Sequence, residues 1–374
     1  QNYSACTVCS PTRAALMTGK YPARLHITDW IPGQMPDNPK LLVPDWTKHL
    51  PHEELTLAEV FQAVGYTTAT IGKWHLGTEA YYPQHQGFDL NIAGTDKPQP
   101  PSYFAPWKIP TLSEGNDGDY LTDRLAEEAV NYLDRVKEKP FFLYYSMHLV
   151  HAPILKTPDS KPGTKDFYED NIAYMDKQVG EIVAELDKLG LREKTLVLFS
   201  GDNGTALNYP STISGRMING KKASMLEGGS RVPLIASRPG TTPAGKVSKD
   251  IVNFTDMLST FVELAGGELP KDFTYDSRSI APQLRGEKGN PREWAFVQLG
   301  ERWYVREQGW KLNEKGELFD MSDAPFTEKL VLASADTAES KAARERLGKV
   351  LSELNPAGGK KDAGANPKKK NADE

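Results

Sequence analysis

The residues best suited to chemistry lie near the start of the chain, in the run Thr7-Val8-Cys9-Ser10-Pro11-Thr12-Arg13. Proline is favoured in the first turn of a helix, because its missing N–H would have no partner there. The spacing predicts a helix that begins near Ser10, with Cys9 at its N-terminal end and Arg13 one turn along on the same face. Free N–H groups and the helix dipole favour an anion at such an end. A thiol, a guanidinium and a helix N-terminus together predict a site for a tetrahedral oxyanion.

Cys6 and Cys9 also form a C-x-x-C pair, which allows other interpretations. A zinc site needs about four ligands, and the sequence contains no second cysteine pair. A redox pair is expected within a strand–helix–strand unit, and the sequence predicts no strand before this one. The remaining alternative is a capped helix with a buried cysteine, which leaves the motifs further along the chain unexplained.

Lys73 and His75 follow a predicted strand at 67–71. Two residues apart on an extended segment, their side chains point the same way. A Lys-x-His pair alone carries little weight. Its place after a helix–strand unit makes it a candidate for anion binding and proton transfer.

Two further polar pairs follow buried strands. His148 and His151 precede a proline at the end of one strand, where open α/β sheets bind ligands. Asp202 and Asn203 follow the next strand and share that edge. Asp-Asn-Gly after a strand is often a simple turn, but carboxylate and amide oxygens also suit Ca²⁺ or Mg²⁺. Because the edge is shared with the histidines, the metal interpretation is preferred.

Four motifs, in this order, resemble those of the type I sulfatases of the alkaline phosphatase superfamily. The first is C-x-P-x-R at Cys9, followed by Leu-Met-Thr-Gly. The others are the segment 65–76 with Gly-Lys-Trp-His, the His-Ala-Pro at 151–153, and the segment 220–234 with Glu-Gly-Gly-Ser-Arg-Val-Pro. The resemblance covers residues 5 to about 331.

The resemblance implies a sulfatase that hydrolyses aryl sulfates or sulfated carbohydrates through a formylglycine made from Cys9. Arg13, Lys73 and Lys222 would stabilise charge on the sulfuryl oxygens, with Lys221 as the alternative to Lys222. His151, rather than His148, would protonate the leaving alcohol or phenol, and His75 would help break down the covalent sulfate ester. Arg231 and Glu227 are interpreted as a structural ion pair.

The resemblance also implies the cofactors, partners and compartment. A calcium ion, with magnesium less favoured, would be bound by position 9, Asp202 and Asn203. A formylglycine-generating enzyme would act on Cys9, and the protein would be periplasmic or extracellular. No signal peptide is visible.

Helices and strands alternate along most of the chain. Amphipathic helices are predicted at 55–65, 120–136, 167–189 and 254–265, and strands at 67–71, 141–145, 195–200 and 232–236. This alternation predicts an α/β fold with a mostly parallel central sheet flanked by helices, as in the alkaline phosphatase and sulfatase families. Short alternating strands from 294 to 320 and a helix at 337–354 predict a small antiparallel C-terminal subdomain.

The predicted organisation is a catalytic domain at 1–290, a C-terminal α+β subdomain at 291–354 and a disordered tail at 355–374. The family begins with a strand that ends in an Asp-Asp pair, which supplies half of the metal shell. That strand is not found before Cys9. We therefore expect an N-terminally truncated catalytic domain with an incomplete metal site.

Composition excludes some classes of function. The net charge of −5 comes without a basic stripe, which argues against a nucleic-acid binder. No run of about 18 apolar residues is present, so no membrane span is expected. Two alternatives to a sulfatase stay open: a phosphonate or phosphate ester hydrolase of the same superfamily, and a non-catalytic binding protein that lacks a complete metal site.

Overall fold

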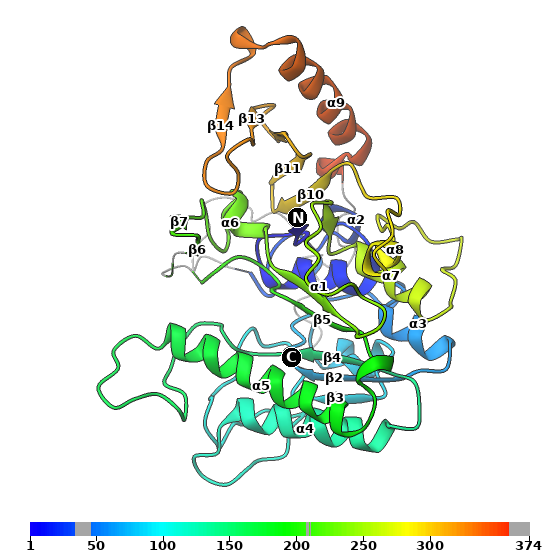
Figure 1. Cartoon of the computed structure of the whole chain (residues 1–374), viewed down its shortest axis with the longest axis vertical. Coiled ribbons are helices and arrows are strands. Elements are labelled where there is room, and N and C mark those ends of the chain that lie inside the picture. The colour runs from blue at the N-terminus through cyan, green and yellow to red at the C-terminus, as the bar shows by residue number, and fades with distance from the viewer. Residues whose placement is uncertain (34–45, 207–208, 210, 359–374) are drawn as a thin grey trace, which may run out of the picture.

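A computed structural model describes residues 1–33, 46–206, 209 and 211–358. Its three-stranded parallel sheet has the order β3–β2–β4, with bounds Leu90–Ile92, Thr67–Gly72 and Phe141–Ser146. Helix α4 (Leu121–Val136) covers one face together with α5 (Tyr168–Lys188), and α3 (Leu57–Ala63) packs on the other (Figure 1). The expected α/β layering is confirmed.

Strand β4 shows how the layers are held. Phe142 and Tyr144 pack against the core cluster that includes residues of α3, whereas Leu143 and Tyr145 pack against the cluster that includes residues of α4. Successive side chains of a strand point to opposite faces. A continuous apolar strand is therefore needed to contact helices on both sides.

The expected single central sheet is divided in the described residues. Strand β5 (Val197–Ser200) pairs with β8 (Leu234–Ser237), and the two form a separate antiparallel sheet. β1 (Asn2–Tyr3) pairs in parallel with β9 (Val252–Asn253). A short strand thus precedes the cysteine pair, contrary to expectation, because two residues are too few to show a periodic pattern.

Helix α1 (Cys9–Thr18) begins as the sequence predicts, with Pro11 in its first turn. It ends at Gly19, whose φ of 65° lets its N–H bond to the carbonyl of Ala15. Ala14 and Met17 are fully buried in the same cluster as residues of α3 and α7 (Asp256–Leu264). The core therefore fixes the helix whose first residue is Cys9.

The C-terminal region forms the predicted antiparallel sheet, in the order β10–β11–β12–β13–β14. Helix α9 (Ala338–Leu354) packs on it through Ala343 and Leu347. The strands are Ala295–Leu299, Arg302–Arg306, Trp310–Asn313, Leu318–Asp320 and Lys329–Val331. The last strand was not predicted, and the domain boundaries stay predictions.

The remaining elements are short. They are α2 (Pro22–Leu25), β6 (Thr212–Ile213), β7 (Arg216–Met217), α6 (Glu227–Ser230) and α8 (Ala281–Leu284), with 3-10 turns at Glu79–Tyr81, Pro83–His85, Arg192–Lys194, Ala333–Ala335 and Pro356–Gly358. Of the tail predicted to be disordered, residues 359–374 lie outside the described residues. None of the described helices is long and apolar enough to cross a membrane.

A buried carboxylate joins the N-terminal strand to the C-terminal sheet. Glu227 is fully buried and accepts hydrogen bonds from Arg306 Nε at 2.9 Å, Tyr3 Oη at 3.0 Å and Arg231 Nη1 at 3.2 Å. Its pairing with Arg231 agrees with the structural role expected for these two residues. Arg306 is also buried, so both charges depend on each other.

Replacing Glu227 with glutamine should lower the free energy of unfolding by about 3–5 kcal/mol, because it leaves Arg306 buried without a countercharge. The measurement is the midpoint of a urea unfolding curve, compared between proteins whose m values are equal. Asp323→Asn, which breaks the exposed pair with Arg216, is the matched control and should leave the midpoint in place. An unchanged midpoint for Glu227→Gln would refute the proposed structural role.

Candidate active site

Cys9 opens α1 and is only 3% exposed. Its Sγ lies 3.5 Å from Lys222 Nζ, and the same Nζ lies 3.0 Å from His151 Nε2. Three predicted site residues from distant parts of the chain therefore meet at the N-terminal end of the helix. Val8, the N-cap residue, makes no side-chain capping bond there, so the first N–H groups are not used by a side-chain cap.

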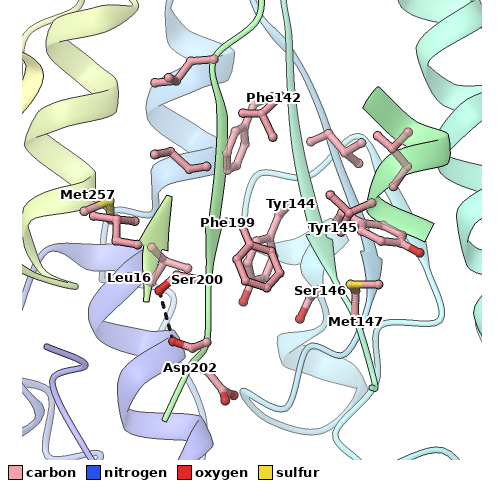
Figure 2. A pocket seen from close by; sticks show the side chains of 18 of the residues that line it. Leu16, Phe142, Tyr144, Tyr145, Ser146, Met147, Phe199, Ser200, Asp202 and Met257 are labelled. Carbon is pink, nitrogen blue, oxygen red and sulfur yellow. Dashed lines mark hydrogen bonds between the residues drawn. The ribbon is translucent and has the colours of Figure 1, made fainter. Parts of the chain in front are cut away.

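Arg13, one turn along α1, holds the ends of β4 and β5 together. Its Nη1 donates to Ser146 Oγ at 2.5 Å, to Tyr144 Oη at 3.1 Å and to the carbonyl of Lys73 at 2.9 Å. Its Nε and Nη2 donate to Asp202 Oδ2 at 3.1 and 3.0 Å. Ser146 and Asp202 lie toward the same end of the pocket in Figure 2. This bonding fixes the guanidinium in place.

A tight turn after β2 positions Lys73. Gly72 has a φ of 103°, and a Cβ there would lie 2.0 Å from the carbonyl oxygen of Ser146. Only glycine fits such an approach. The turn lets Lys73 N donate to that same carbonyl at 2.8 Å. The side chain of Lys73 is 3% exposed, so its ammonium is held inside the site.

His75 reaches the site in a different way from the one predicted. Its φ is 64°, so the segment that carries Lys73 and His75 is not extended. Its backbone N–H bonds to the carbonyl of Thr95, and its Nε2 lies against the carbonyl of Ile31. A ring nitrogen facing a carbonyl must donate, so the neutral ring carries its lone pair on Nδ1. Among the described residues, that buried Nδ1 has no hydrogen-bond partner.

The two histidines after β4 have different surroundings. His151 Nδ1 lies 2.7 Å from the carbonyl of Ala152, so it donates there and leaves Nε2 to accept from Lys222. His148 is 6% exposed, and neither of its ring nitrogens has a partner among the described residues. The hydroxyl of Tyr103 donates to the carbonyl of His148 at 3.3 Å and supports this loop.

Close packing of glycines places Lys222. A Cβ on Gly204 would lie 1.8 Å from the carbonyl oxygen of Gly228, and Gly204 N donates to the carbonyl of Gly229 at 2.9 Å. Lys222 N bonds to the carbonyl of Thr205 at 3.0 Å, beside that contact. Lys221, the alternative lysine, is on the exposed side.

Electrostatics in the site favour an anion at position 9. Burial acts to raise the pKa of the Cys9 thiol, but Lys73, the rings of His151 and His75, and Lys222 lower this pKa well below its usual value. Burial, the largest cause, also lowers the pKa of Lys73 and the pKa of His75.

The pKa of His148 is lowered to about 3 by burial and by the charges of Lys73 and Arg13. His148 is therefore neutral at physiological pH.

The described residues do not by themselves fit a calcium ion. Asn203 Oδ1 is buried without a partner, which suits a ligand, but Asp202 already pairs with Arg13. Calcium takes about six to eight oxygen ligands. No group of three His, Cys, Asp or Glu side chains that could hold a metal is present in the part of the chain that the structure describes. The assignment of Cys9, Asp202 and Asn203 as metal ligands therefore stays a prediction.

The arrangement brings the predicted residues together from five segments of the chain. The residues that contact Cys9 or interact with it electrostatically are Arg13, Lys73, His75, His151 and Lys222. Sequence reasoning missed Tyr144 and Ser146 as partners of Arg13. Their polar groups at the end of an otherwise apolar strand are the signal that could have identified them.

Comparisons with known proteins bear on the family to which the chain belongs. A family model described as Sulfatase matches residues 1–267. An arylsulfatase from Hemicentrotus pulcherrimus is 30% identical over 319 residues, covering 79% of this chain and 56% of the relative. An N-acetylgalactosamine-6-sulfatase from Canis lupus familiaris is 32% identical over 313 residues, covering 76% of this chain and 58% of the relative. The chain thus spans less than two thirds of these relatives.

A solved structure supports the fold. The crystal structure of Ps i-CgsB in complex with k-i-k-neocarrahexaose is similar with a TM-score of 0.75 and 24% identity. The match covers 95% of this chain and 83% of that chain. At this identity the similarity concerns the fold alone.

Proposed function

The chain belongs to the sulfatase family, and on that premise we propose that it hydrolyses sulfate esters at the site around Cys9. The observation that carries the proposal is the contact of Lys222 with both Cys9 Sγ and His151 Nε2. This contact supports the proposal, because the proposed nucleophile, a cation and a proton carrier would then all be within reach of one small anion.

Residue 9 suits conversion to formylglycine, because Cys9 is followed by Pro11 and Arg13 at the spacing of the family motif. Its position at the start of α1, facing cations, also suits an oxygen nucleophile that acquires negative charge. A formylglycine there would supply a hydrated aldehyde, one oxygen of which attacks sulfur. The chain's other residues bind the sulfate group and move protons.

Three cations serve the sulfuryl oxygens in this proposal. Lys222 Nζ lies 3.5 Å from Cys9 Sγ, and the charges of Lys222 and Lys73 both lower the pKa of that thiol. Arg13 donates five hydrogen bonds to protein groups in the described part of the chain, so it contributes a fixed positive charge. Charges that are already fixed near a developing anion do not have to rearrange during the reaction, so they stabilise it without an added free-energy cost.

The histidines divide the proton transfers. His151 Nε2 accepts from Lys222 in the structure, so in this proposal it first takes up a proton, from Lys222 or from water, and then passes that proton to the leaving oxygen. His148 is less suited to this role, because its pKa is lowered to about 3. His75 is held neutral with its free lone pair on Nδ1, which suits a base that accepts a proton from the group at position 9.

The substrate is proposed to be an aryl sulfate or a sulfated carbohydrate. The names of the two relatives above cover both classes. A phosphate or phosphonate ester hydrolase is the alternative, since the same cations would also bind a phosphoryl group. Steady-state turnover of matched aryl sulfate and aryl phosphate esters separates them: higher kcat/KM for the sulfate is expected, higher kcat/KM for the phosphate would overturn the choice, and neither activity would favour a non-catalytic binding protein.

In a host that co-expresses a formylglycine-generating enzyme, we expect Cys9 to be converted and Cys6 to stay a thiol. Replacement of the thiol by an aldehyde lowers the mass of the peptide by ~18 Da. Peptide mass spectrometry after proteolysis measures the change, and Arg13→Ala, which removes the arginine of the motif, should reduce conversion. An unmodified Cys9 in that host would contradict the proposed nucleophile.

A further inference from the structure

The loop that carries Lys222 lies between β7 and α6. Its residues 218–226 (the lysine loop), all of which the structure describes, form turns and bends without a helix or strand. Ser224 N donates to the carbonyl of Lys221 at 2.9 Å, so Lys222 and Ala223 occupy the two central positions of a tight turn. The shape of this turn therefore decides where the ammonium of Lys222 lies.

Ala223 gives the turn an unfavourable backbone conformation. Its φ is 64°, in the left-handed region that suits glycine at this position of a turn. An alanine stays in that region only where contacts from elsewhere in the fold hold it. One such contact is the bond from Ala223 N to the carbonyl of Thr7 at 2.9 Å, two residues before Cys9. This contact fixes the turn against the segment that leads into α1.

A buried ion pair of the C-terminal sheet holds the far end of the lysine loop. Lys311 lies on β12 and Glu328 directly precedes β14, and their side chains are 4% and 1% exposed. Lys311 Nζ donates to the carbonyl of Met225 at 2.9 Å. Glu328 Oε1 accepts from Glu227 N at 2.8 Å, while its other oxygen pairs with Lys311. Two backbone groups close to the turn are therefore fixed by one pair of charges.

The surroundings of Lys311 suit a fixed ammonium. Its Nζ lies 4.5 Å from the centroid of the Tyr304 ring and 5.5 Å from that of Phe319, and aromatic faces attract a cation. The free-energy cost of burying two charges is often no more than repaid by their attraction, so an apolar pair of similar size serves stability as well. An apolar pair cannot bind the carbonyl of Met225 and the N–H of Glu227, however. The loop that it holds therefore explains the ion pair better than stability alone does.

From these contacts we propose that Lys311 and Glu328 are positioning residues for Lys222. They hold the lysine loop so that the Lys222 ammonium contacts both Cys9 Sγ, at 3.5 Å, and His151 Nε2, at 3.0 Å. The inference rests on the proposed function, in which that ammonium stabilises the sulfuryl oxygens. It gives the C-terminal sheet a part in the reaction, although none of the site residues above lies on this sheet.

The test replaces both charges at once, in Lys311→Met/Glu328→Gln. This double variant leaves neither charge buried without its partner, which is the change that destabilises a fold most when only one member of a pair is replaced. It keeps the approximate size of both side chains and removes the bond to the carbonyl of Met225. Arg216→Met/Asp323→Asn is the matched control, because that exposed pair also joins β7 to the C-terminal region.

Kinetics test whether the ion pair acts through Lys222. On a series of aryl sulfates, well below the unfolding temperature, we expect the double variant to lose about tenfold or more in kcat/KM, by the same factor for every leaving group. In a Lys222→Ala background the same two substitutions should change kcat/KM by less than about twofold, because the charge that they position is gone. The control should keep the wild-type values. No loss, or equal losses in both backgrounds, would overturn the proposal, because a general effect on the fold does not depend on Lys222.

Hydrogen exchange tests the same proposal without any reaction. The amides of Lys222, Ala223 and Gly228 are bonded to backbone carbonyls, and we expect them to exchange about tenfold faster or more in the double variant, while β10 and β11 keep their protection. Unchanged exchange of these amides, or equally faster exchange of the whole C-terminal sheet, would refute the positioning role. Wild-type protein that hydrolyses no sulfate ester would instead refute the proposed function, and the exchange of the lysine loop would still decide whether the ion pair holds it.

Discussion

Replacing Cys9 with alanine should abolish hydrolysis of sulfate esters, with a loss on the order of 10⁴-fold or more, as expected for removal of a catalytic nucleophile. The side chain begins α1 and is contacted by Lys222. Alanine removes the nucleophile and leaves the surrounding cations in place. The measurement is kcat/KM on an activated aryl sulfate with protein from a host that makes formylglycine.

Cys6→Ala is the matched control for that result. Cys6 lies three residues before Cys9 and is fully buried among apolar residues. Burial raises the pKa of its thiol far above the usual value. Its substitution should change stability but not the chemistry at position 9. Activity retained in Cys9→Ala, or lost equally in a folded Cys6→Ala, would contradict the assignment of the nucleophile.

Local features could be predicted from the sequence because they depend on neighbouring residues. Pro11 set the first turn of α1, and Thr56 with Glu59 forms the predicted capping box at the start of α3. Gly65, with a φ of 87°, follows the end of that helix. The antiparallel C-terminal sheet was visible as short alternating runs.

Strand pairing depends on residues that are distant in the sequence, so it was harder to predict. The apolar run at 195–200 and the run at 232–236 both have the composition of buried parallel strands, yet β5 and β8 pair antiparallel. Nothing in either run encodes which strand will be its neighbour. The division of the sheet between β4 and β5 was likewise absent from the prediction of a single sheet.

The site residues were named from motifs, but their geometry required the fold. The left-handed φ of His75 and the bonding of Asp202 to Arg13 follow from contacts with Ile31, Thr95 and Ser146 that no spacing rule contains. The ion pair between Asp202, a predicted metal ligand, and Arg13 is a tertiary effect of this kind. The sequence motifs identify the residues of a site, and the packing of the fold decides which of these residues bind each other.

His151→Ala should slow hydrolysis of esters with poor leaving groups by about 10²–10⁴-fold and have little effect on activated aryl sulfates. A poor leaving group needs a proton as the bond breaks, and in the proposed mechanism His151 Nε2 supplies it after it has itself been protonated, for example by Lys222, which lies 3.0 Å away. Lys222→Ala should instead lower turnover for all leaving groups by about 10²–10³-fold, because its charge stabilises the sulfuryl oxygens. The measurement is log kcat/KM against the pKa of the leaving group for each variant.

The adjacent and exposed Lys221 provides the control, since Lys221→Ala should leave the whole series unchanged. Lys222 Nζ and His151 Nε2 are 3.0 Å apart, so the double variant should lose less than the product of the two single losses. A steeper slope in His151→Ala and a parallel shift in Lys222→Ala would separate proton donation from charge stabilisation. An equal loss for every leaving group in His151→Ala would refute its role as the acid, whatever the outcome for Lys222.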